Sequence, residues 1–493
     1  MVFLEFVKIF LTGNPIIFFY VYWSNLSPHK LPVMQFKTII ALAFPLIFAA
    51  CKKNKPDAVA AQPLVTPSPL PVPDDVLKDS TLLLTKGIYL WNTQLPASFN
   101  ARGYDGPVKI MEAIRQYSME SGFTQPVDRF SFAIKKTEWD NLSAGLNSVA
   151  TETSENGDFG FTVFFRGEGD LRVRLVEPKS PAGMAGVRRG WRVTKINASS
   201  DITTSNATFI VDNIYNAATV SITFLKPDGS SENVTFNQAH YTTKPVYLDT
   251  VYNINNKKIG YLVFNSFLGK TDELYSNFQR VFNRFAGEGI QDVVIDLRYN
   301  GGGYVSVQER LANYLVNTAA NGGIMMKQVY NAANSTSNST TKFSKAGSLN
   351  LARIYFIVGR ATASASELLI NNLKPYMEVK LIGGTTYGKP VGYFPIPVGD
   401  WYILPVSFRT TNKNGEGNYF NGIPVNATVA DGLDKDWGDI TETSLASAIR
   451  NITIGAYRSQ TQPQNYIEPL NVAKGNQALE APMLKLSVGG KGG

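Results

Sequence analysis

The chain has 493 residues, 44% of them hydrophobic and 17% charged, which suits more than one globular domain and excludes disordered or collagen-like classes. Its formal net charge is +8, but no Lys/Arg run exceeds two residues, which argues against a nucleic-acid partner. With one cysteine (Cys51) and two histidines (His29 and His240), an internal disulfide, a Cys/His metal cluster and a Cys–His catalytic pair are excluded. We expect no cofactor, and any hydrolytic chemistry must use hydroxyls, carboxylates, amines or His240.

The N-terminal region has the pattern of a secretory signal. Lys37 and an apolar stretch precede two alanines and Cys51, which resembles a bacterial lipoprotein signal at residues 34–50. Cys51 would then be lipidated and hold the protein to the surface of a membrane in the cell envelope, facing the periplasm or the outside. The alternative is a buried cysteine in a core helix. We interpret residues 1–33 as a misassigned upstream extension and the Pro-rich residues 51–79 as an extended tether.

Residues 80–150 are predicted to form an N-terminal helical domain. Apolar side chains follow a helical spacing after Gly106-Pro107. Four aromatic side chains are expected to supply a small core: Trp91, Phe130, Phe132 and Trp139.

Residues 155–240 change to alternating apolar and polar positions, as in half-buried strands. With the stretch SPAGMAGVRRGW (180–191), they resemble a PDZ domain. The resemblance implies that Phe159, Gly160 and Phe161 form a loop whose backbone N–H groups bind the C-terminal carboxylate of a peptide. The alternative is a small β-domain with ordinary glycine turns. We call residues 155–240 the PDZ-like segment.

Residues 250–455 alternate between predicted strands and helices, which indicates an α/β core around a central sheet. Residues 331–350 are polar and are predicted to form a surface loop or the edge of a flap, and residues 456–493 an irregular tail. The predicted strands are Ile259–Phe264, Val293–Leu297, Ile354–Val358, Val379–Ile382 and Tyr402–Phe408. The predicted helices are Asp272–Phe285, Val307–Val316 and Ala365–Leu373.

Two strand ends carry candidate chemistry. The stretch VVIDLRYNGGGY (293–304) places three glycines after an apolar strand, where backbone N–H groups can face a ligand. A phosphate-binding loop is the alternative. In GRATASASELLINN (359–372), Ser364 lies at a strand-to-helix turn that can project its hydroxyl into a cleft. Ser364 and Glu367 also satisfy a helix capping box, which is the structural alternative.

Lys389 lies among glycines in GGTTYGKPVG (383–392). A lysine without water around it has a lowered pKa and can act as a general base, so serine and lysine together make a hydrolase without histidine. An ordinary turn lysine is the alternative.

The ordered set DLRYNGGG, GRATASASE and TTYGKP, after a PDZ-like segment, resembles the C-terminal processing peptidases, also called tail-specific proteases. The resemblance implies a multidomain α+β protein with a crotonase/ClpP-like α/β catalytic core. It implies Ser364 as nucleophile and Lys389 as base, at the family's spacing of 389 − 364 = 25. The oxyanion hole would use the N–H of Ala365 and of Gly302 or Gly303.

One position departs from the family pattern. Tyr393 stands where the family often has a glutamine that orients the lysine. Either the Tyr393 hydroxyl holds the lysine instead or catalysis is slower, and the sequence does not decide between the two. Ser366 is the alternative nucleophile. The function expected is a serine endopeptidase acting on proteins with exposed C-terminal tails, and the competing one is a peptide- or ligand-binding lipoprotein of the same fold with weak or no turnover. The sequence does not decide the oligomeric state.

Overall fold

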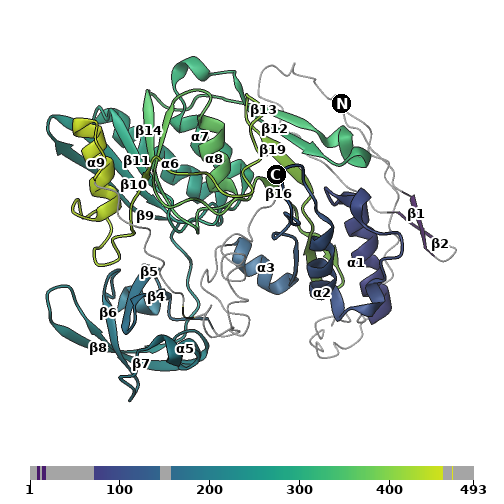
Figure 1. Ribbon diagram of the computed structural model, residues 1–493, viewed down its shortest axis with the longest axis horizontal. Coiled ribbons are helices and arrows are strands. Elements are labelled where there is room, and N and C mark those ends of the chain that lie inside the picture. The colour runs from purple at the N-terminus through teal and green to yellow at the C-terminus, as the bar shows by residue number, and fades with distance from the viewer. Residues whose placement is uncertain (1–7, 12–13, 18–71, 145–156, 459–468, 470–493) are drawn as a thin grey trace, which may run out of the picture. The chain divides into compact units, whose positions relative to one another are not determined.

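The computed structural model describes residues 8–11, 14–17, 72–144, 157–458 and 469 (Figure 1). The predicted signal peptide, Cys51 and most of the predicted tether lie outside the described residues, as does the predicted tail beyond residue 458 apart from residue 469. Within the predicted upstream extension, β1 (Lys8–Leu11) and β2 (Asn14–Ile17) pair antiparallel. Of the helices in the described residues, none has the length and apolar character needed to span a membrane.

A six-stranded sheet forms the centre of the α/β part, in the order β20-β15-β14-β11-β10-β9 (Figure 1). All its neighbouring strands are parallel except β9, which is antiparallel to β10. The strands are β9 (Val246–Ile254), β10 (Lys257–Phe264), β11 (Asp292–Asp296), β14 (Arg353–Val358), β15 (Glu378–Gly383) and β20 (Ala427–Thr428). Four of the strands predicted from apolar runs are therefore confirmed.

Helices cover both faces of this sheet. Because side chains alternate along a strand, Val293 and Ile295 pack on one core while Val294 packs on the other. The first core contains α6 (Thr271–Gly287), α7 (Val305–Leu315) and α8 (Ala365–Leu373), and the second contains α9 (Thr443–Ile454). The carboxyl ends of β11, β14 and β15 lead into the three segments that the sequence marked for chemistry.

The segment predicted as a helical domain contains three helices and a strand. They are α1 (Asp74–Ile88), α2 (Gly106–Ile114), β3 (Phe132–Lys135) and α3 (Lys136–Ser143). Since α1 begins at Asp74, the predicted tether ends before residue 79.

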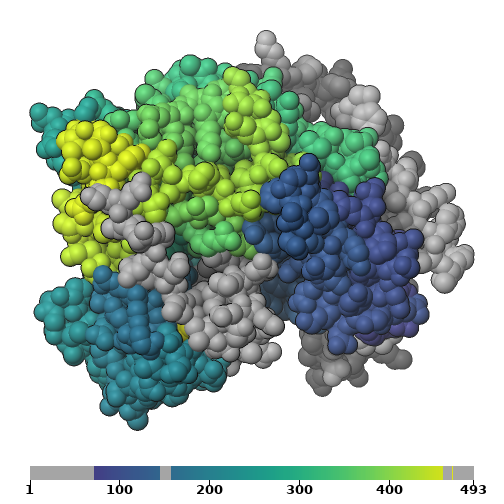
Figure 2. All heavy atoms as spheres, in the orientation of Figure 1, coloured from purple at the N-terminus to yellow at the C-terminus, as the bar shows by residue number. Residues whose placement is uncertain are grey.

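The expected small aromatic core is not separate. Its side chains pack with residues from much later in the chain, among them Tyr387, Tyr393 and Phe420. β3 also pairs with β18 (Trp401–Leu404), which pairs with β17 (Ile396–Val398). Figure 2 shows the blue atoms of this segment directly against green atoms of the later chain.

A further four-stranded sheet has the order β13-β12-β19-β16. Its strands are β12 (Ile324–Tyr330), β13 (Ser339–Lys342), β16 (Val391–Gly392) and β19 (Phe408–Thr411). Two predictions need correction here. The loop predicted at 331–350 contains β13, and the strand predicted at Tyr402–Phe408 is interrupted at Pro405, so its ends belong to different sheets.

The PDZ-like segment forms a five-stranded antiparallel sheet in the order β4-β5-β6-β7-β8 around its own core. Its strands are β4 (Phe161–Gly167), β5 (Asp170–Val176), β6 (Arg192–Ile196), β7 (Thr219–Leu225) and β8 (Ser231–Asn237). Its helices are α4 (Pro181–Met184), α5 (Ala207–Val211) and a π-helical turn, η5 (Asp212–Asn216). This segment also contains the short 3₁₀ turn Thr204–Asn206. The 3₁₀ turns elsewhere in the described residues are Asn92–Gln94, Ala101–Gly103, Arg115–Tyr117, Thr318–Ala320 and Ala332–Ser337.

Candidate active site

One pocket brings together the residues that the three strand ends supply. Ser364, Ala365, Gly303, Lys389 and Tyr393 all line it. The rest of its lining is mostly apolar: Val305, Leu368, Val391, Gly392, Phe408, Thr410 and Tyr419. The loops after parallel strands meet at the same edge of a sheet, which explains why segments so distant in sequence converge here.

Ser364 adopts a backbone conformation that is rare for a residue with a side chain. Its φ is 56° and its ψ is −116°, immediately before α8. Only four residues other than glycine have a positive φ in the described chain. Such strain at a strand-to-helix turn raises a side chain out of the turn, and it persists only where surrounding contacts impose it. Ser364 is half-buried.

The loop that contains Gly301, Gly302 and Gly303, called the glycine loop below, lies directly against the turn at Ser364, called the serine turn. A methyl group built at Gly302 would lie 2.8 Å from Ser364 Cβ and 2.9 Å from the nitrogen of Ala365, so only glycine allows this approach. Gly302 donates its N–H to Asn300 Oδ1 at 2.9 Å, whereas Gly303 is the loop glycine that lines the pocket. The carbonyl of Asn300 accepts the N–H of Ala363, which fixes the loop to the turn.

Lys389 is almost completely removed from water, with an exposed fraction of 2%. Burial lowers its pKa from 10.5 to about 7, although the carboxylates of Asp128 and Glu367 act in the opposite direction. Its Nζ lies 3.8 Å from the centre of the Tyr393 ring, over the ring face. The sequence left the role of Tyr393 open, and the structure places the Tyr393 ring against the amine.

Glu367 connects the serine turn to residues 384–390, the loop that carries Lys389 and is called the lysine loop below. Its Oε2 accepts the backbone N–H of Ser364 at 3.0 Å and that of Lys389 at 2.8 Å. Its Oε1 accepts the N–H of Gly388 at 2.6 Å and the hydroxyl of Thr386 at 2.5 Å. The side chain is fully buried, and burial raises its pKa while these donors act to lower it. The sequence marked Glu367 as a capping residue and missed this second role, because nothing in one sequence relates it to residues 386–389.

Ser366 is separated from the pocket. It is fully buried and donates its hydroxyl to the carbonyl of Asn300 at 2.9 Å. It does not line the pocket that contains Ser364, so its position suits a structural contact and not the role of alternative nucleophile.

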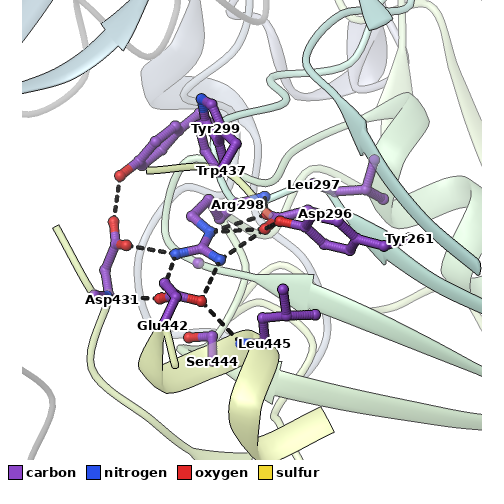
Figure 3. A network of polar contacts seen from close by, with 12 residues as sticks. Tyr261, Asp296, Leu297, Arg298, Tyr299, Asp431, Trp437, Glu442, Ser444 and Leu445 are labelled. Carbon is purple, nitrogen blue, oxygen red and sulfur yellow. Dashed lines mark hydrogen bonds and ion pairs between the residues drawn. The ribbon is translucent and has the colours of Figure 1, made fainter. Parts of the chain in front are cut away.

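A buried ionic network holds the strand end before the glycine loop (Figure 3). The guanidinium of Arg298 donates to Asp296 and Glu442 with distances of 2.7 to 3.1 Å, and to Asp431 at 2.5 Å. Arg189 of the PDZ-like segment also pairs with Asp431. Although burial alone raises the pKa of Asp431, the two arginines lower it to about 2. The network therefore keeps its charges and anchors the PDZ-like segment beside the strand end.

The predicted carboxylate-binding loop lies at the start of β4. Phe159 and Phe161 are buried in the core, and Gly160 has a φ of 80°, with no room for a Cβ beside Ser180. Strand β4 lies at one end of the sheet order. On that edge, the hydroxyl of Tyr215 accepts the N–H of Val163 at 3.1 Å.

No group of three or more His, Cys, Asp or Glu side chains is arranged to hold a metal ion within the part of the chain that the structure describes.

Residues 258–429 match the family model described as peptidase family S41. These residues form a peptidase family S41 domain. The S41 domain includes the glycine loop, the serine turn and the lysine loop. This match, together with the named relatives below, confirms the predicted resemblance to the C-terminal processing peptidases.

Named relatives agree with this family. A CtpA-like serine protease of Staphylococcus aureus (strain COL) is 26% identical over 320 residues, 63% of this chain and 62% of the relative. The carboxy-terminal processing protease CtpB of Bacillus subtilis (strain 168) is 26% identical over 266 residues, 52% of each chain. The alignments thus span about three fifths or less of the length of these curated relatives. A crystal structure described as an S41-type protease from Bacteroides fragilis NCTC 9343 has the same fold, with a TM-score of 0.62 at 22% identity, over 76% of this chain and 97% of that one.

Replacing Glu367 by glutamine tests its connecting role. Glutamine has one acceptor oxygen and an NH₂ group, so at least one donor near residue 367 loses its acceptor. We expect the free energy of unfolding, measured with urea, to fall by about 1–3 kcal/mol. The matched control is Glu378→Gln, where the side chain is 51% exposed and pairs with Lys380, and the expected change is within about 0.5 kcal/mol. Equal effects of the two substitutions would contradict the role given to Glu367.

Proposed function

We propose that this protein is a serine endopeptidase in which Ser364 is the nucleophile and Lys389 is its general base. The observation that carries the proposal is that one pocket is lined by a serine on a strained turn and by a buried lysine whose pKa is lowered to about 7. A base with a pKa near the working pH is deprotonated often enough to accept a proton and basic enough to take it. The S41 match over these residues supports the same assignment.

The reaction proceeds through an acyl-enzyme. Neutral Lys389 accepts the proton of the Ser364 hydroxyl while Oγ attacks the carbonyl carbon of the peptide bond. The ammonium then returns the proton to the leaving amine, which departs as the new N-terminus of the second product. A water molecule gives a proton to Lys389 and attacks the carbonyl carbon of the ester. When the bond between this carbon and Ser364 Oγ breaks, Lys389 returns the proton to Oγ, which releases the other product and restores Ser364 and the neutral amine.

Backbone N–H groups of Ala365 and Gly303 stabilise the oxyanion in both steps. Ala365 is the first residue of α8, where N–H groups have no acceptor within the helix and the helix dipole favours negative charge. Gly302 is the less suitable second donor because its N–H is engaged by Asn300. Gly303 lines the pocket and supplies the second donor.

The substrates we propose are proteins of the cell envelope or secreted proteins with exposed C-terminal tails. The apolar pocket lining beside Ser364 favours an apolar substrate side chain next to the cleaved bond. The PDZ-like segment would bind the tail through the backbone of Phe159, Gly160 and Phe161, and lipidated Cys51 would keep the enzyme at a membrane surface.

Substitution of each dyad residue tests the mechanism. Ser364→Ala removes the nucleophile and Lys389→Ala removes the base, so each should lower kcat/KM for an unstructured peptide at least about a thousandfold. Labelling by a fluorophosphonate should disappear in Ser364→Ala. The matched controls are Ser276→Ala and Lys342→Ala, both at exposed positions, which should keep the wild-type rate. Hydrolysis by Ser364→Ala at the control rate refutes the assignment, and absence of turnover in the wild type favours the binding protein of the same fold.

The rate should depend on the protonation of Lys389. Because only the neutral amine accepts the serine proton, kcat/KM should rise with pH through a midpoint near 7 and level off above it. At pH 5.5 the rate should be about thirtyfold below the plateau. Intrinsic fluorescence over the same pH range checks that the protein stays folded. A midpoint near 10 would mean that the amine is not desolvated in solution.

Recognition of the substrate tail should require its terminal carboxylate. Hydrogen bonds to a charged acceptor contribute about 1.5–3 kcal/mol, so amidation of the C-terminus should lower kcat/KM about tenfold or more. Acetylation of the N-terminus of the same peptide is the control and should change the rate less than twofold. If both modifications have the same effect, the PDZ-like loop does not bind the tail.

A further inference from the structure

Three residues outside the S41 match act on the loop that carries Lys389: Arg129 and Phe130 contact the loop, and the carboxylate of Asp128 acts on the charge of the amine. Asp128, Arg129 and Phe130 lie just before β3, whereas the match begins at residue 258. The proposed mechanism does not use them, and of the three only Phe130 was expected to contribute to the small aromatic core.

Arg129 binds the backbone of the lysine loop. Its NH2 donates to the carbonyl of Tyr387 at 2.9 Å, of Phe420 at 3.1 Å and of Gly388 at 3.3 Å. Its guanidinium carbon also lies 4.9 Å from the centre of the Tyr387 ring. One charged side chain thus fixes the two residues that precede Lys389, and it joins them to Phe420.

Phe130 forms part of the apolar surroundings of the amine. It is fully buried, and its ring centre lies 5.8 Å from Lys389 Nζ. The ring packs edge-on against Tyr387 at 5.9 Å and stacks with Phe420 at 6.5 Å. Because a ring of this size occupies the space beside the amine, water is excluded from that side.

Asp128 supplies a fixed carboxylate. It is 4% exposed and accepts hydrogen bonds from the Tyr89 hydroxyl, from the Ser131 hydroxyl and from two backbone N–H groups. These donors hold the side chain in one orientation. Of the charges that act on Lys389, Asp128 has the largest influence in favour of its ammonium form, ahead of Glu367.

We propose that Asp128, Arg129 and Phe130 are positioning residues for the Lys389 amine, supplied to the S41 domain by residues 72–144, the N-terminal segment. Arg129 fixes the loop, Phe130 excludes water, and Asp128 opposes the loss of the ammonium charge. This proposal rests on the proposed function for its catalytic meaning, but the state of the amine is measurable without turnover.

Other groups near Lys389 stay constant in the test. Glu367 is the second carboxylate, and the rings of Tyr387 and Tyr393 pack on the same loop. Arg360 donates to the carbonyls of Thr386 and Tyr387 at 3.3 Å. A change in the titration of Lys389 on substitution of Asp128 or Phe130 therefore reports on the substituted residue.

The experiment measures how fast acetic anhydride acetylates Lys389 at each pH, by mass spectrometry of the peptide that contains it. The full chain with Ser364→Ala is used, so that the serine does not react. Adding Asp128→Asn should shift the midpoint of the labelling curve to lower pH, because a charge that favours the ammonium is gone. Adding Phe130→Leu should shift it to higher pH, because water reaches the amine. A shift of this midpoint by half a pH unit changes the labelling rate at pH 6 about threefold.

The matched control is Glu112→Gln, which removes one carboxylate from α2 where the side chain is 45% exposed, and it should leave the midpoint unchanged. A purely structural role for Asp128 would lower the thermal midpoint of unfolding without moving the labelling curve, and this result overturns the proposal. If Asp128→Asn does not fold, the labelling curve of Phe130→Leu tests the proposal. A midpoint that is unchanged or moves to lower pH overturns the proposal.

With Ser364 intact, Arg129→Lys should lower kcat about tenfold with KM within twofold, because the lysine side chain is one bond shorter and its ammonium does not reach the position from which the guanidinium NH2 binds the three carbonyls. A wild-type protein that shows the expected labelling shifts but no peptide hydrolysis refutes the proposed function alone. A protein that hydrolyses peptides through Ser364 and Lys389 but shows no shifts refutes this inference alone.

Discussion

The carboxylate of Glu367 is a common acceptor for the backbone of Ser364 and of Lys389, so the relative position of two distant segments depends on one buried side chain. A buried carboxylate is costly unless donors surround it, and four donors from the serine turn and the lysine loop do so here. The donors therefore have to be in place together. The same requirement keeps the lysine loop beside the helix start, where the pocket forms.

Around this acceptor the molecule concentrates features that are unfavourable elsewhere in a fold. Ser364 has a positive φ, Gly302 leaves no room for a side chain, and Lys389 is an amine without water around it. Strain and desolvation of this kind persist only where neighbouring contacts compensate for them, and they are concentrated at functional sites. Here the compensation comes from Glu367, from Asn300 in the glycine loop and from the ionic network around Arg298 (Figure 3).

The sequence alone predicted much of the central sheet, because parallel strands that are buried on both faces consist of consecutive apolar residues, as in Val293–Leu297. It also marked Ser364 and Lys389, since a hydroxyl at a turn and a lysine among glycines are local signals. It did not predict the pairing of β3 with β18 or the division of Tyr402–Phe408 between two sheets. These depend on contacts between segments far apart in the chain, for which residue patterns within one segment contain no information. The same reason explains why the sequence indicated the capping contact of Glu367 with Ser364, which the structure contains, but not its contacts with residues 386–389.

The N-terminal segment and residues 387–420 share one hydrophobic core, so the limits of the family match do not coincide with the limits of a folding unit. A recombinant fragment cut at residue 258 would present Tyr387 and Phe420 to water and would lack three residues of the lysine's surroundings. Domain exchange between relatives should therefore carry the N-terminal segment together with the S41 domain. In evolution, too, we expect core substitutions in the N-terminal segment to be tolerated only with matching changes in residues 387–420.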